Sequence, residues 1–422
     1  MSRYGPLWPL MTPADQQGRD EFCAVSASGV RVRMLDGREL LCATSGLWNS
    51  NLGYGNPAVA QAVGDALREA SYLSAWNAEN VQVRRASAEL VELAGAGSFG
   101  RVLFSTSGGA ANDLAMKLVR QFQVLRGKPD RRAILALRNA FHGLTFGASA
   151  LTDANLGQQM YGVDRSLVAH VPANDGERLR ETLERYDGRI AALFVEPVMG
   201  SGAIPLTDEF VADVLQLRRE HGFALVADEV STGFGRTGNT VFASTRWPEP
   251  PDVLITAKAL TNGTLAASAV IVSHEVAEAF HAPGVLLGHA ETQAGTPVVG
   301  AAISATVAEM RRLDTPTLSA KLGGRLDVEL AALAFEEPLV GAATGVGCMR
   351  ALHLVGPDGE PMPQAEVSAV IRAVRAAGVI VHPGPHCFQI IPALVYSDAD
   401  LDELLGAVRA GLHAHAAQDG AP

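Results

Sequence analysis

The fold is decided by the stretch Ala224-Leu-Val-Ala-Asp-Glu-Val-Ser-Thr-Gly-Phe-Gly-Arg-Thr-Gly238, followed after a spacer by Pro251-Asp-Val-Leu-Ile-Thr-Ala-Lys258. Each part contains a short apolar run, which is typical of a strand in a parallel sheet covered on both faces. Asp228 follows the first run and Lys258 follows the second. Because ligands of open α/β sheets bind beyond the carboxyl ends of the strands, we expect both side chains to face one crevice.

Lysine is rare in this chain, which makes Lys258 informative. The 34 Lys and Arg residues include only Lys117, Lys128, Lys258 and Lys321 as lysines. Arginine stays protonated, whereas a lysine removed from water can lose its proton and form a Schiff base. Lys258 is therefore a candidate catalytic amine, and the alternative is a surface residue at a strand end. The other three lysines suit a helical ion pair, a turn and a polar helix.

The composition excludes several classes of function. The chain has 422 residues, 48% of them hydrophobic, and a net charge of −11 without long charged runs. Nucleic acid and anionic membranes are therefore not expected partners. Cys23, Cys42, Cys348 and Cys387 are scattered, as in a reducing compartment. Neither a secretory signal nor an apolar run of about 18 residues occurs, so we expect a cytoplasmic protein whose partners are small molecules or proteins.

The middle of the chain alternates short apolar runs with helical patterns. Strands are expected at residues 133–137, 167–171, 191–195, 224–230 and 253–257, and helices at residues 58–69, 77–93 and 298–313. This alternation predicts an α/β fold with a doubly wound, mostly parallel sheet. We expect residues 46–313 to form this large domain. Residues 1–45, an arm followed by short strands, and residues 314–422 are expected to form a smaller α/β domain from both chain ends.

Residues 102–113 are expected to form a strand end, a turn and the start of an amphipathic helix. They read Val-Leu-Phe-Ser-Thr-Ser-Gly-Gly-Ala-Ala-Asn-Asp. Gly108 and Gly109 would let the backbone approach an anion, which would face the unpaired amides and the positive end of the helix. This arrangement suits a phosphate group. The alternative is an ordinary helix cap at Ser107, and the local sequence leaves both open.

Three other functional signatures fit the chain poorly. Residues 233–238 match the G-x-G-x-x-G pattern of dinucleotide sites, but the following residues lack a helical pattern. His413 and His415 would point to different faces of a helix, and His382 and His386 lie next to prolines. We therefore expect no metal site. The Gly-x-Ser-x-Gly turn of hydrolases does not occur.

Taken together, the motifs resemble those of the class III aminotransferases of the ornithine, GABA and ω-amino acid type, pyridoxal-phosphate enzymes of fold type I. The likeness covers most of the chain and is densest at residues 104–120, 141–147, 196–200, 228–238, 258–263 and 292–297. The run Asp-Glu-Val-Ser-Thr-Gly-Phe-Gly-Arg-Thr-Gly is its most specific part. The resemblance implies fold type I, pyridoxal 5′-phosphate as the cofactor, and a homodimer with shared active sites.

The resemblance also implies roles for the residues at the strand ends. Lys258 would carry the cofactor as a Schiff base and move a proton, and Asp228 would pair with the pyridine nitrogen of the cofactor. A carboxylate there favours the protonated ring, which acts as an electron sink. Phe141 would stack on one face of the ring and Val230 would cover the other, with His142 beside them.

The phosphate site implied by the resemblance departs from the family pattern. Ser107, Gly108 and Gly109 would bind the phosphate, and Thr292 of the partner subunit would complete the site. The family's Ser-Gly-Ser-Glu-Ala reads Ser-Gly-Gly-Ala-Ala here, so a hydroxyl and a carboxylate are missing at Gly109 and Ala110. Backbone amides can still bind the anion.

Four further residues are implied to surround the cofactor or the substrate. Glu196, in the family's Glu-Pro strand end, would support the site. Ser231 replaces a glutamine that touches the phenolic oxygen of the cofactor, and it is a shorter donor. Trp8 and Trp48 resemble aromatic residues that line the substrate entrance. The Gly- and Asn-rich pattern of residues 46–57, which include Trp48, is by itself typical of an irregular wall or of a ligand pocket.

The C-terminal part lacks the arginine with which the family grips a substrate carboxylate. The two candidate positions are His382, in Val-Ile-Val-His-Pro, and Gln389, in Phe-Gln-Ile-Ile-Pro. Neither supplies the bidentate fork of arginine. We therefore expect a small-molecule amino donor and a carbonyl acceptor without an adjacent carboxylate. The missing arginines and the arm Leu-Trp-Pro-Leu-Met-Thr-Pro also resemble aminotransferases that aminate the C-terminal ketone of a ribosomal peptide (daptide type).

Other functions remain open on the same scaffold. They are an ordinary ω-amino acid/α-keto acid aminotransferase, an aminomutase or decarboxylase, and a protein that binds the cofactor without turnover. The run Gly-Phe-Gly-Arg-Thr-Gly favours a transferase over a mutase. Lys258 and Asp228 argue against a catalytically silent protein, because both chemical groups are present.

Overall fold

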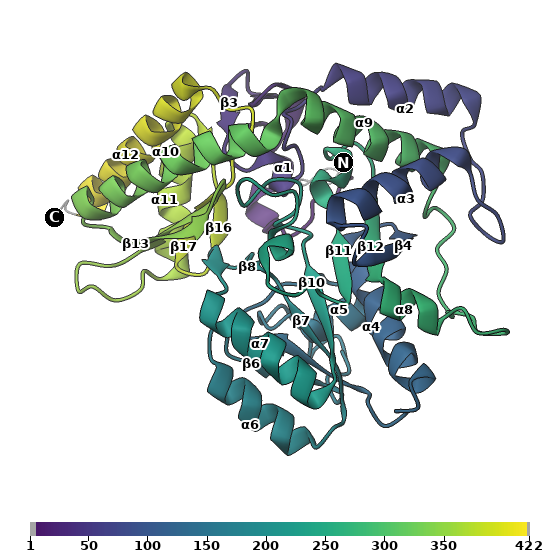
Figure 1. The fold of residues 1–422 in the computed structure, drawn as a ribbon. Helices are drawn as coiled ribbons and strands as arrows, with labels where there is room; N and C mark the ends of the chain where they lie inside the picture. Colours follow the sequence, from purple (N-terminus) through teal and green to yellow (C-terminus); the bar gives the residue numbers. More distant parts are fainter. Residues whose placement is uncertain (1–5, 420–422) are drawn as a thin grey trace.

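The strands that precede Asp228 and Lys258 lie side by side in a seven-stranded sheet (Figure 1). The computed structural model describes residues 6–419, so the first five residues of the expected arm and the last three of the chain lie outside it. The strands, in sheet order, are β4 (Phe99–Ser105), β12 (Ser268–Ser273), β11 (Val253–Thr256), β10 (Ala224–Asp228), β7 (Ile190–Val195), β5 (Ala133–Leu137) and β6 (Val168–Val171).

The predicted mostly parallel sheet is confirmed. The pairs β11–β10, β10–β7, β7–β5 and β5–β6 are parallel, and β12 runs antiparallel to β11 and to β4. β10 ends at Asp228, two residues earlier than predicted, because the Val230 amide donates to Asp228 Oδ1 over 3.1 Å and turns the chain. Asp228 pairs with Ile255 in the register, so Asp228 and Lys258 follow neighbouring strands at the same sheet edge.

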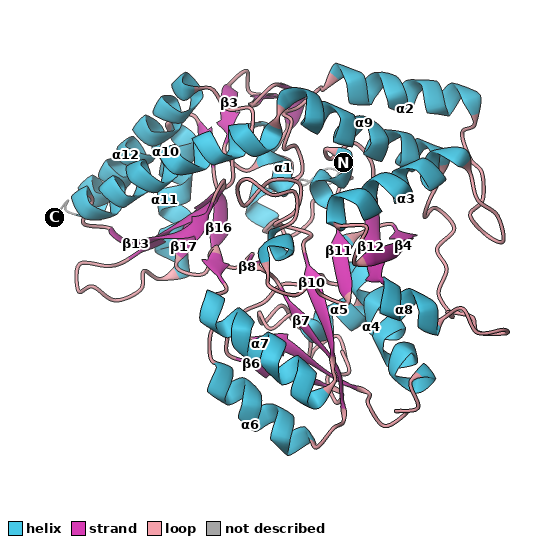
Figure 2. Cartoon of the chain, in the orientation of Figure 1, coloured by secondary structure: helices cyan, strands magenta, loops and turns pink. Residues whose placement is uncertain are grey.

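Helices cover both faces of this sheet (Figure 2). They are α3 (Val81–Ala94), α4 (Gly108–Leu125), α5 (Phe146–Leu151), α6 (Gly176–Tyr186), α7 (Asp208–His221), α8 (His274–Ala279) and α9 (Pro297–Leu313). A further helix, α2 (Pro57–Glu69), packs on α9. Ile134 and Phe194 pack in one core with the apolar face of α4. Leu193 points to the other face, into a core with α6 and α7. This alternation follows from the period of two along each strand.

A second group of elements forms a smaller unit beside the large sheet (Figure 1). Its sheet has the order β13 (Val340–Val346), β14 (Met349–Leu354), β17 (Cys387–Ile390) and β16 (His382–Gly384). Its helices are α10 (Thr315–Glu336), α11 (Gln364–Ala376) and α12 (Asp398–Asp419). A two-stranded ribbon, β8 (Val198–Met199) with β9 (Ile204–Pro205), follows β7.

The two ends of the chain share one sheet and one core. The sheet has the order β1 (Ala24–Ser28), β2 (Arg31–Met34), β3 (Glu39–Cys42) and β15 (Val379–Ile380), and β15 runs parallel to β3. Leu41 and Ala43 pack in the same hydrophobic core as Val374 and Val379. Burial of this shared apolar surface joins the N-terminal strands to the C-terminal helices.

Element ends follow local capping chemistry. The helix predicted at residues 77–93 begins at Val81, because the Asn80 side chain accepts from the Val83 amide over 3.0 Å and caps it. The helix predicted at residues 298–313 ends at Leu313, and Asp314 follows in the left-handed region with φ 50°. Short 3-10 turns occur at Ala14–Gln16, Asp20–Phe22, Ala243–Arg246 and Lys258–Thr261. Within residues 6–419, none of the helices has the length and apolarity needed to span a membrane.

Candidate active site

Asp228 is a buried carboxylate held by three donors at the end of β10. Its Oδ2 lies 2.8 Å from His142 Nδ1 and accepts from Asn112 Nδ2 over 2.9 Å. Its Oδ1 accepts from the Val230 amide over 3.1 Å. A buried carboxylate that accepts from several donors keeps one orientation.

His142 is a buried hydrogen-bonding partner of Asp228. Burial of His142 disfavours its charged form, but the hydrogen bond and charge of Asp228, together with the charge of Glu196, raise its pKa above the ordinary value. Its ring also meets the edge of Phe194, with 6.2 Å between the ring centroids. The sequence placed His142 next to Phe141 and Val230, and its contact with Asp228 was not predicted.

Lys258 follows β11 in a strained turn, and its amine points at polar neighbours. Its φ of 49° lies in the left-handed region, which is uncommon for a side chain other than glycine and occurs often at functional sites. Lys258 Nζ donates to Ser231 Oγ over 2.7 Å. Burial lowers the pKa of Lys258 to about 8, although the charges of Asp228 and Glu196 act in the opposite direction. The amine can therefore exist without its proton near neutral pH.

Trp48 lies over Lys258 and belongs to a left-handed turn that no pattern in the sequence predicts. α1 (Ser45–Trp48) has φ angles of 47°, 58°, 65° and 66° along its four residues. This conformation costs roughly 1–2 kcal/mol for each non-glycine residue. The Trp48 ring centroid lies 4.2 Å from Lys258 Nζ and 5.3 Å from the His382 ring, which it meets edge-on. This part of residues 46–57 therefore lies at the candidate site.

Arg236 holds the turn that carries Trp48. Its Nη2 donates to Ser45 Oγ over 3.1 Å and to Asn51 Oδ1, and its Nη1 donates to the carbonyls of Cys348 and Pro392. These four acceptors are uncharged. Burial lowers the pKa of this guanidinium to about 10, because these neutral acceptors do not fully compensate its positive charge.

The turn before α4 forms a close backbone cradle. Ser107 Oγ accepts from the Ala110 amide over 3.1 Å, so the predicted cap is present. A Cβ atom at Gly108 would lie 3.1 Å from the Val230 side chain, and one at Gly109 would lie 3.3 Å from Thr145 Oγ1. Glycine thus permits the close approach of the start of α4 to Val230 and Thr145.

Glu196 fixes the turn that presents Phe141. Its Oε2 accepts from the Phe141 amide and its Oε1 from the Gly200 amide, each over 3.0 Å. Burial raises the pKa of Glu196, and the charge of Asp228 adds to this effect. The Phe141 side chain is 39% exposed, although Ala140 and His142 on either side are buried. Its ring is therefore free to stack on a ligand.

His382 and Gln389 face each other across the strands β16 and β17. They are paired in the antiparallel register. Burial and the charge of Lys258 lower the pKa of His382 to about 4, so His382 is neutral at pH 7. Gln389 is 2% exposed and its Oε1 is buried without a hydrogen-bond partner. His382, which interacts with Lys258, and its strand partner Gln389 are therefore polar and uncharged.

Two predicted site residues are exposed at the surface. Trp8 is 84% exposed in the N-terminal arm. Thr292 is exposed, and its carbonyl accepts from Tyr72 Oη over 3.0 Å. Their roles at the entrance and at a shared phosphate site stay predictions.

Asn112 and Arg236 were not predicted as site residues from the sequence. Asn112 Nδ2 contacts Asp228, the carbonyl of Gly108 and the carbonyl of His142, and so joins three parts of the site. An amide at a buried position of an amphipathic helix is a signal that could have found it. Arg236 lay within the quoted glycine-rich run, but no local pattern predicts its distant partners.

The chain's own groups fit the expected cofactor. Asp228 offers a buried carboxylate, Lys258 an amine that can be neutral, Phe141 an open aromatic face, and Gly108 and Gly109 a backbone cradle at a helix start. These groups come from strand ends and turns on one edge of the sheet. Together they can hold a planar, charged ring that carries an anionic group.

Comparisons with known proteins agree with this geometry. Residues 14–412 match the family model described as aminotransferase class-III. An acetylornithine aminotransferase of Mycobacterium leprae is 31% identical over 406 residues, covering 96% of this chain and 94% of that protein. An amine transaminase from an uncultivated Pseudomonas species, solved in its PLP-bound form, has a TM-score of 0.92 at 26% identity, with 97% of this chain and 98% of that chain covered. An (S)-enantioselective omega-transaminase from Thermomicrobium roseum has a TM-score of 0.91 at 28% identity, with 97% and 96% covered. The expected fold type is confirmed by these structures.

Proposed function

This chain belongs to the class-III aminotransferases, and from that premise we propose that it transfers an amino group from a donor amine or amino acid to an aldehyde or ketone without a carboxylate next to the carbonyl. The enzyme uses pyridoxal 5′-phosphate. When bound, this cofactor supplies the electron sink that stabilises the deprotonated substrate carbon.

We assign the work of the protein to a few side chains. Asp228, fixed by His142 and Asn112, binds the pyridine nitrogen and keeps it protonated. Lys258 holds the cofactor, and its Nζ takes and returns a proton, for which a pKa of about 8 is well suited. Phe141 and Val230 position the ring between them. Ser107, Gly108 and Gly109 bind the phosphate through the start of α4, and Ser231 stands next to Lys258 Nζ.

The observation that carries the substrate proposal is the uncharged wall formed by His382 and Gln389. A substrate carboxylate buried there would lack a cationic partner, which is costly. Arg236 also acts on Lys258, but its Nη atoms are bound to protein acceptors. The solved relative described as an amine transaminase supports the same class of substrate.

A peptide with a C-terminal ketone is a second candidate acceptor. Such a peptide also lacks a carboxylate beside the reacting carbon. The arm favours it, because Leu7, Trp8, Leu10 and Met11 are 76–91% exposed and could contact an extended ligand. A C-terminal methyl ketone attached to a short apolar peptide, compared with the same ketone on a single residue, tests this: a lower KM for the longer ketone supports it.

The decisive experiment is a donor and acceptor panel with matched carboxylated and carboxylate-free pairs. We expect ketones and aldehydes to exceed the corresponding α-keto acids in kcat/KM. If α-keto acids are the only good acceptors, the protein is an ordinary ω-amino acid aminotransferase. Product analysis separates the remaining alternatives, since a mutase or decarboxylase releases no oxo product in step with the transferred amine, and a silent scaffold releases none.

We further propose a homodimer with shared sites, in which Thr292 of the partner subunit completes the phosphate site. The exposed position of Thr292 supports this proposal. We place the enzyme in the cytoplasm and assign residues 46–313 to the cofactor-binding domain, with residues 1–45 and 314–422 in the small domain. The shared core of Leu41 and Val379 supports that division.

A further inference from the structure

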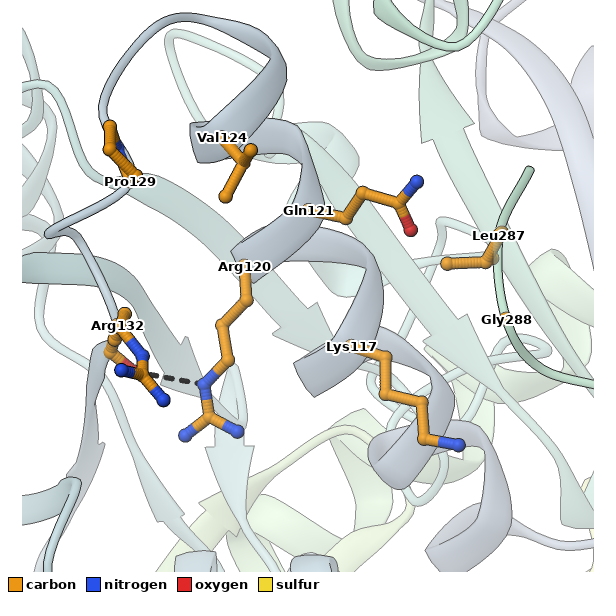
Figure 3. A pocket seen from close by; sticks show the side chains of 8 residues that line it. All are labelled: Lys117, Arg120, Gln121, Val124, Pro129, Arg132, Leu287 and Gly288. Atoms are coloured by element: carbon orange, nitrogen blue, oxygen red, sulfur yellow. Dashed lines mark hydrogen bonds between the residues drawn. The ribbon is translucent and has the colours of Figure 1, made fainter. Parts of the chain in front are cut away.

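A second hollow lies on the outer face of α4 and shares no residue with the candidate active site (Figure 3). Its volume is about 560 Å³, which is in the range of small-ligand pockets. Its wall is formed by three segments: α4, the turn before β5, and the chain that precedes α9. The lining residues are Lys117, Arg120, Gln121, Val124, Pro129, Arg132, Leu287 and Gly288.

The charge of this hollow is opposite to that of the protein. Lys117, Arg120 and Arg132 line it, and no Asp or Glu does. Within the described part of the chain, none of the three forms an ion pair with a carboxylate. The whole chain has 45 acidic and 34 basic residues, so acidic partners are plentiful elsewhere. Three cations around one hollow without a carboxylate in its lining are therefore a specific local arrangement, and Asp164 acts on Arg120 from outside the lining.

The two guanidinium groups are held near each other by the backbone. Arg120 Nε donates to the main-chain oxygen of Arg132 over 2.9 Å, and both side chains reach the same side of the hollow in Figure 3. Burial lowers the pKa of Arg120 and the like charge of Arg132 lowers it further, whereas the charge of Asp164 acts in the opposite direction. The repulsion between the two guanidinium groups favours the binding of an anion, which would neutralise their charge.

The hollow is not purely polar. Val124, Pro129 and Leu287 contribute apolar wall beside the cations. Guanidinium forks match the oxygens of a phosphate group, and three cations suit a ligand with two negative charges. Apolar side chains suit an organic group attached to that phosphate.

We propose that this hollow is a binding site for a small organic phosphate monoester, with the phosphate on Arg120 and Arg132 and the organic part against Val124 and Leu287. The site is separate from the one that holds the cofactor phosphate. This proposal does not depend on the substrate of the transferase.

Lys117 is a poor choice for testing the site because it has a second contact. Its Nζ lies 3.4 Å from His289 Nδ1, and His289 Nε2 lies 3.2 Å from Glu291 Oε1. Glu291 in turn accepts from the Thr106 amide over 3.1 Å, next to the cofactor cradle. A change at Lys117 would therefore disturb the cradle as well. Arg132→Gln is cleaner, since it keeps the main-chain oxygen that Arg120 binds.

The test is calorimetric titration of cofactor-loaded enzyme, freed of excess cofactor, with phenyl phosphate and with inorganic phosphate. We expect saturable binding, tighter for phenyl phosphate. Arg132→Gln should weaken it about 10- to 100-fold, as expected for a lost charged hydrogen bond, and the Arg120→Gln/Arg132→Gln double variant should abolish it. Arg33→Gln is the matched control, because Arg33 is exposed on β2, far from this lining, and should leave binding unchanged.

Two further measurements keep the result clear. The melting temperature of each variant without ligand shows whether its fold is retained, and the cofactor absorbance during titration shows whether phenyl phosphate displaces the cofactor. Equal binding by the wild type and a folded double variant would overturn the proposal. So would no saturable binding by the wild type, or binding that occurs only with loss of the cofactor.

Discussion

The indole ring of Trp48 lies over the amine of Lys258, with 4.2 Å between the ring centroid and Nζ. The ring belongs to a left-handed turn, and the amine belongs to a residue that is itself left-handed. Two strained segments from distant parts of the sequence thus meet at the reacting nitrogen. Strain of this kind persists only where the surrounding structure fixes it, as Arg236 fixes the Trp48 turn.

Lys258 is expected to be the lysine that carries the cofactor. Reduction of the loaded enzyme with borohydride, followed by peptide mapping, should place the label on Lys258. Lys258→Ala should lower kcat by about 10²–10⁴-fold or more, because a positioned proton-transfer group is lost. Lys321→Ala is the control, since Lys321 is exposed and pairs with Asp398 at the surface. A label on Lys321, Lys117 or Lys128 would contradict the assignment.

Asp228→Asn should damage the chemistry more than cofactor binding. The amide fills the same space but lacks the charge that favours a protonated pyridine nitrogen. An opposite charge nearby shifts a pKa by about 1–3 units, so we expect kcat to fall about 10–10³-fold while the cofactor stays bound. Single-turnover kinetics and cofactor titration measure the two effects separately. Equal losses in both would show that Asp228 serves binding alone.

Asn112→Leu should destabilise the protein and loosen Asp228. The change leaves buried acceptors on Asp228, Gly108 and His142 without their donor. Such a loss costs about 1–3 kcal/mol of unfolding free energy. Chemical denaturation gives this value. Asn56→Leu, at the exposed start of α2, removes a helix-capping amide instead and should leave the cofactor spectrum unchanged.

The low pKa of Lys258 predicts the pH dependence of cofactor uptake by cofactor-free enzyme. Only the neutral amine reacts, and a pKa of about 8 is below the ordinary 10.5. At pH 7 about one tenth of the amine is neutral, so the uptake rate should rise about tenfold toward a plateau above pH 9. A free lysine analogue, measured in parallel, accounts for the titration of the cofactor itself. A midpoint near 10 for the enzyme would mean that burial does not shift this amine.

Gln389→Arg should add activity toward α-keto acids. Gln389 faces His382 and is buried with a free carbonyl oxygen, so a guanidinium there would meet a substrate carboxylate. We expect kcat/KM for pyruvate to rise about tenfold or more, as for one charged hydrogen bond. Gln389→Met, of similar length without charge, is the control. No change in Gln389→Arg, together with good activity of the wild type on α-keto acids, would remove the basis of the substrate proposal.

The sequence predicted the parts of the site that depend on local order. Asp228 and Lys258 each follow a short apolar run, and neighbouring parallel strands bring such ends together whatever the loops do. The helix cap at Ser107 was likewise predicted, because a serine before an apolar helical pattern is a local signal, and the binding of a phosphate there stays a proposal. The resemblance to a family then supplied the roles.

The remaining parts depend on contacts between distant segments. Trp48 reaches Lys258 only because Arg236 ties its turn to residues 348 and 392. Asn112 looks like an ordinary helix residue until the Asp228 strand packs against α4. No periodicity or spacing in the sequence predicts these contacts between distant residues. Thr292 needs a second chain, so its role rests on the proposed dimer.

The parallel pair of β3 and β15 sets an order of events during synthesis. Leu41 leaves the ribosome long before its strand partner Val379, and at about 5–20 residues per second the delay is roughly 20–70 s. Throughout that time one edge of β3 has no strand beside it, and open strand edges invite pairing with other chains. A chain truncated before Val379 would leave this edge of β3 unpaired permanently. Early termination should therefore yield aggregates rather than a smaller working enzyme.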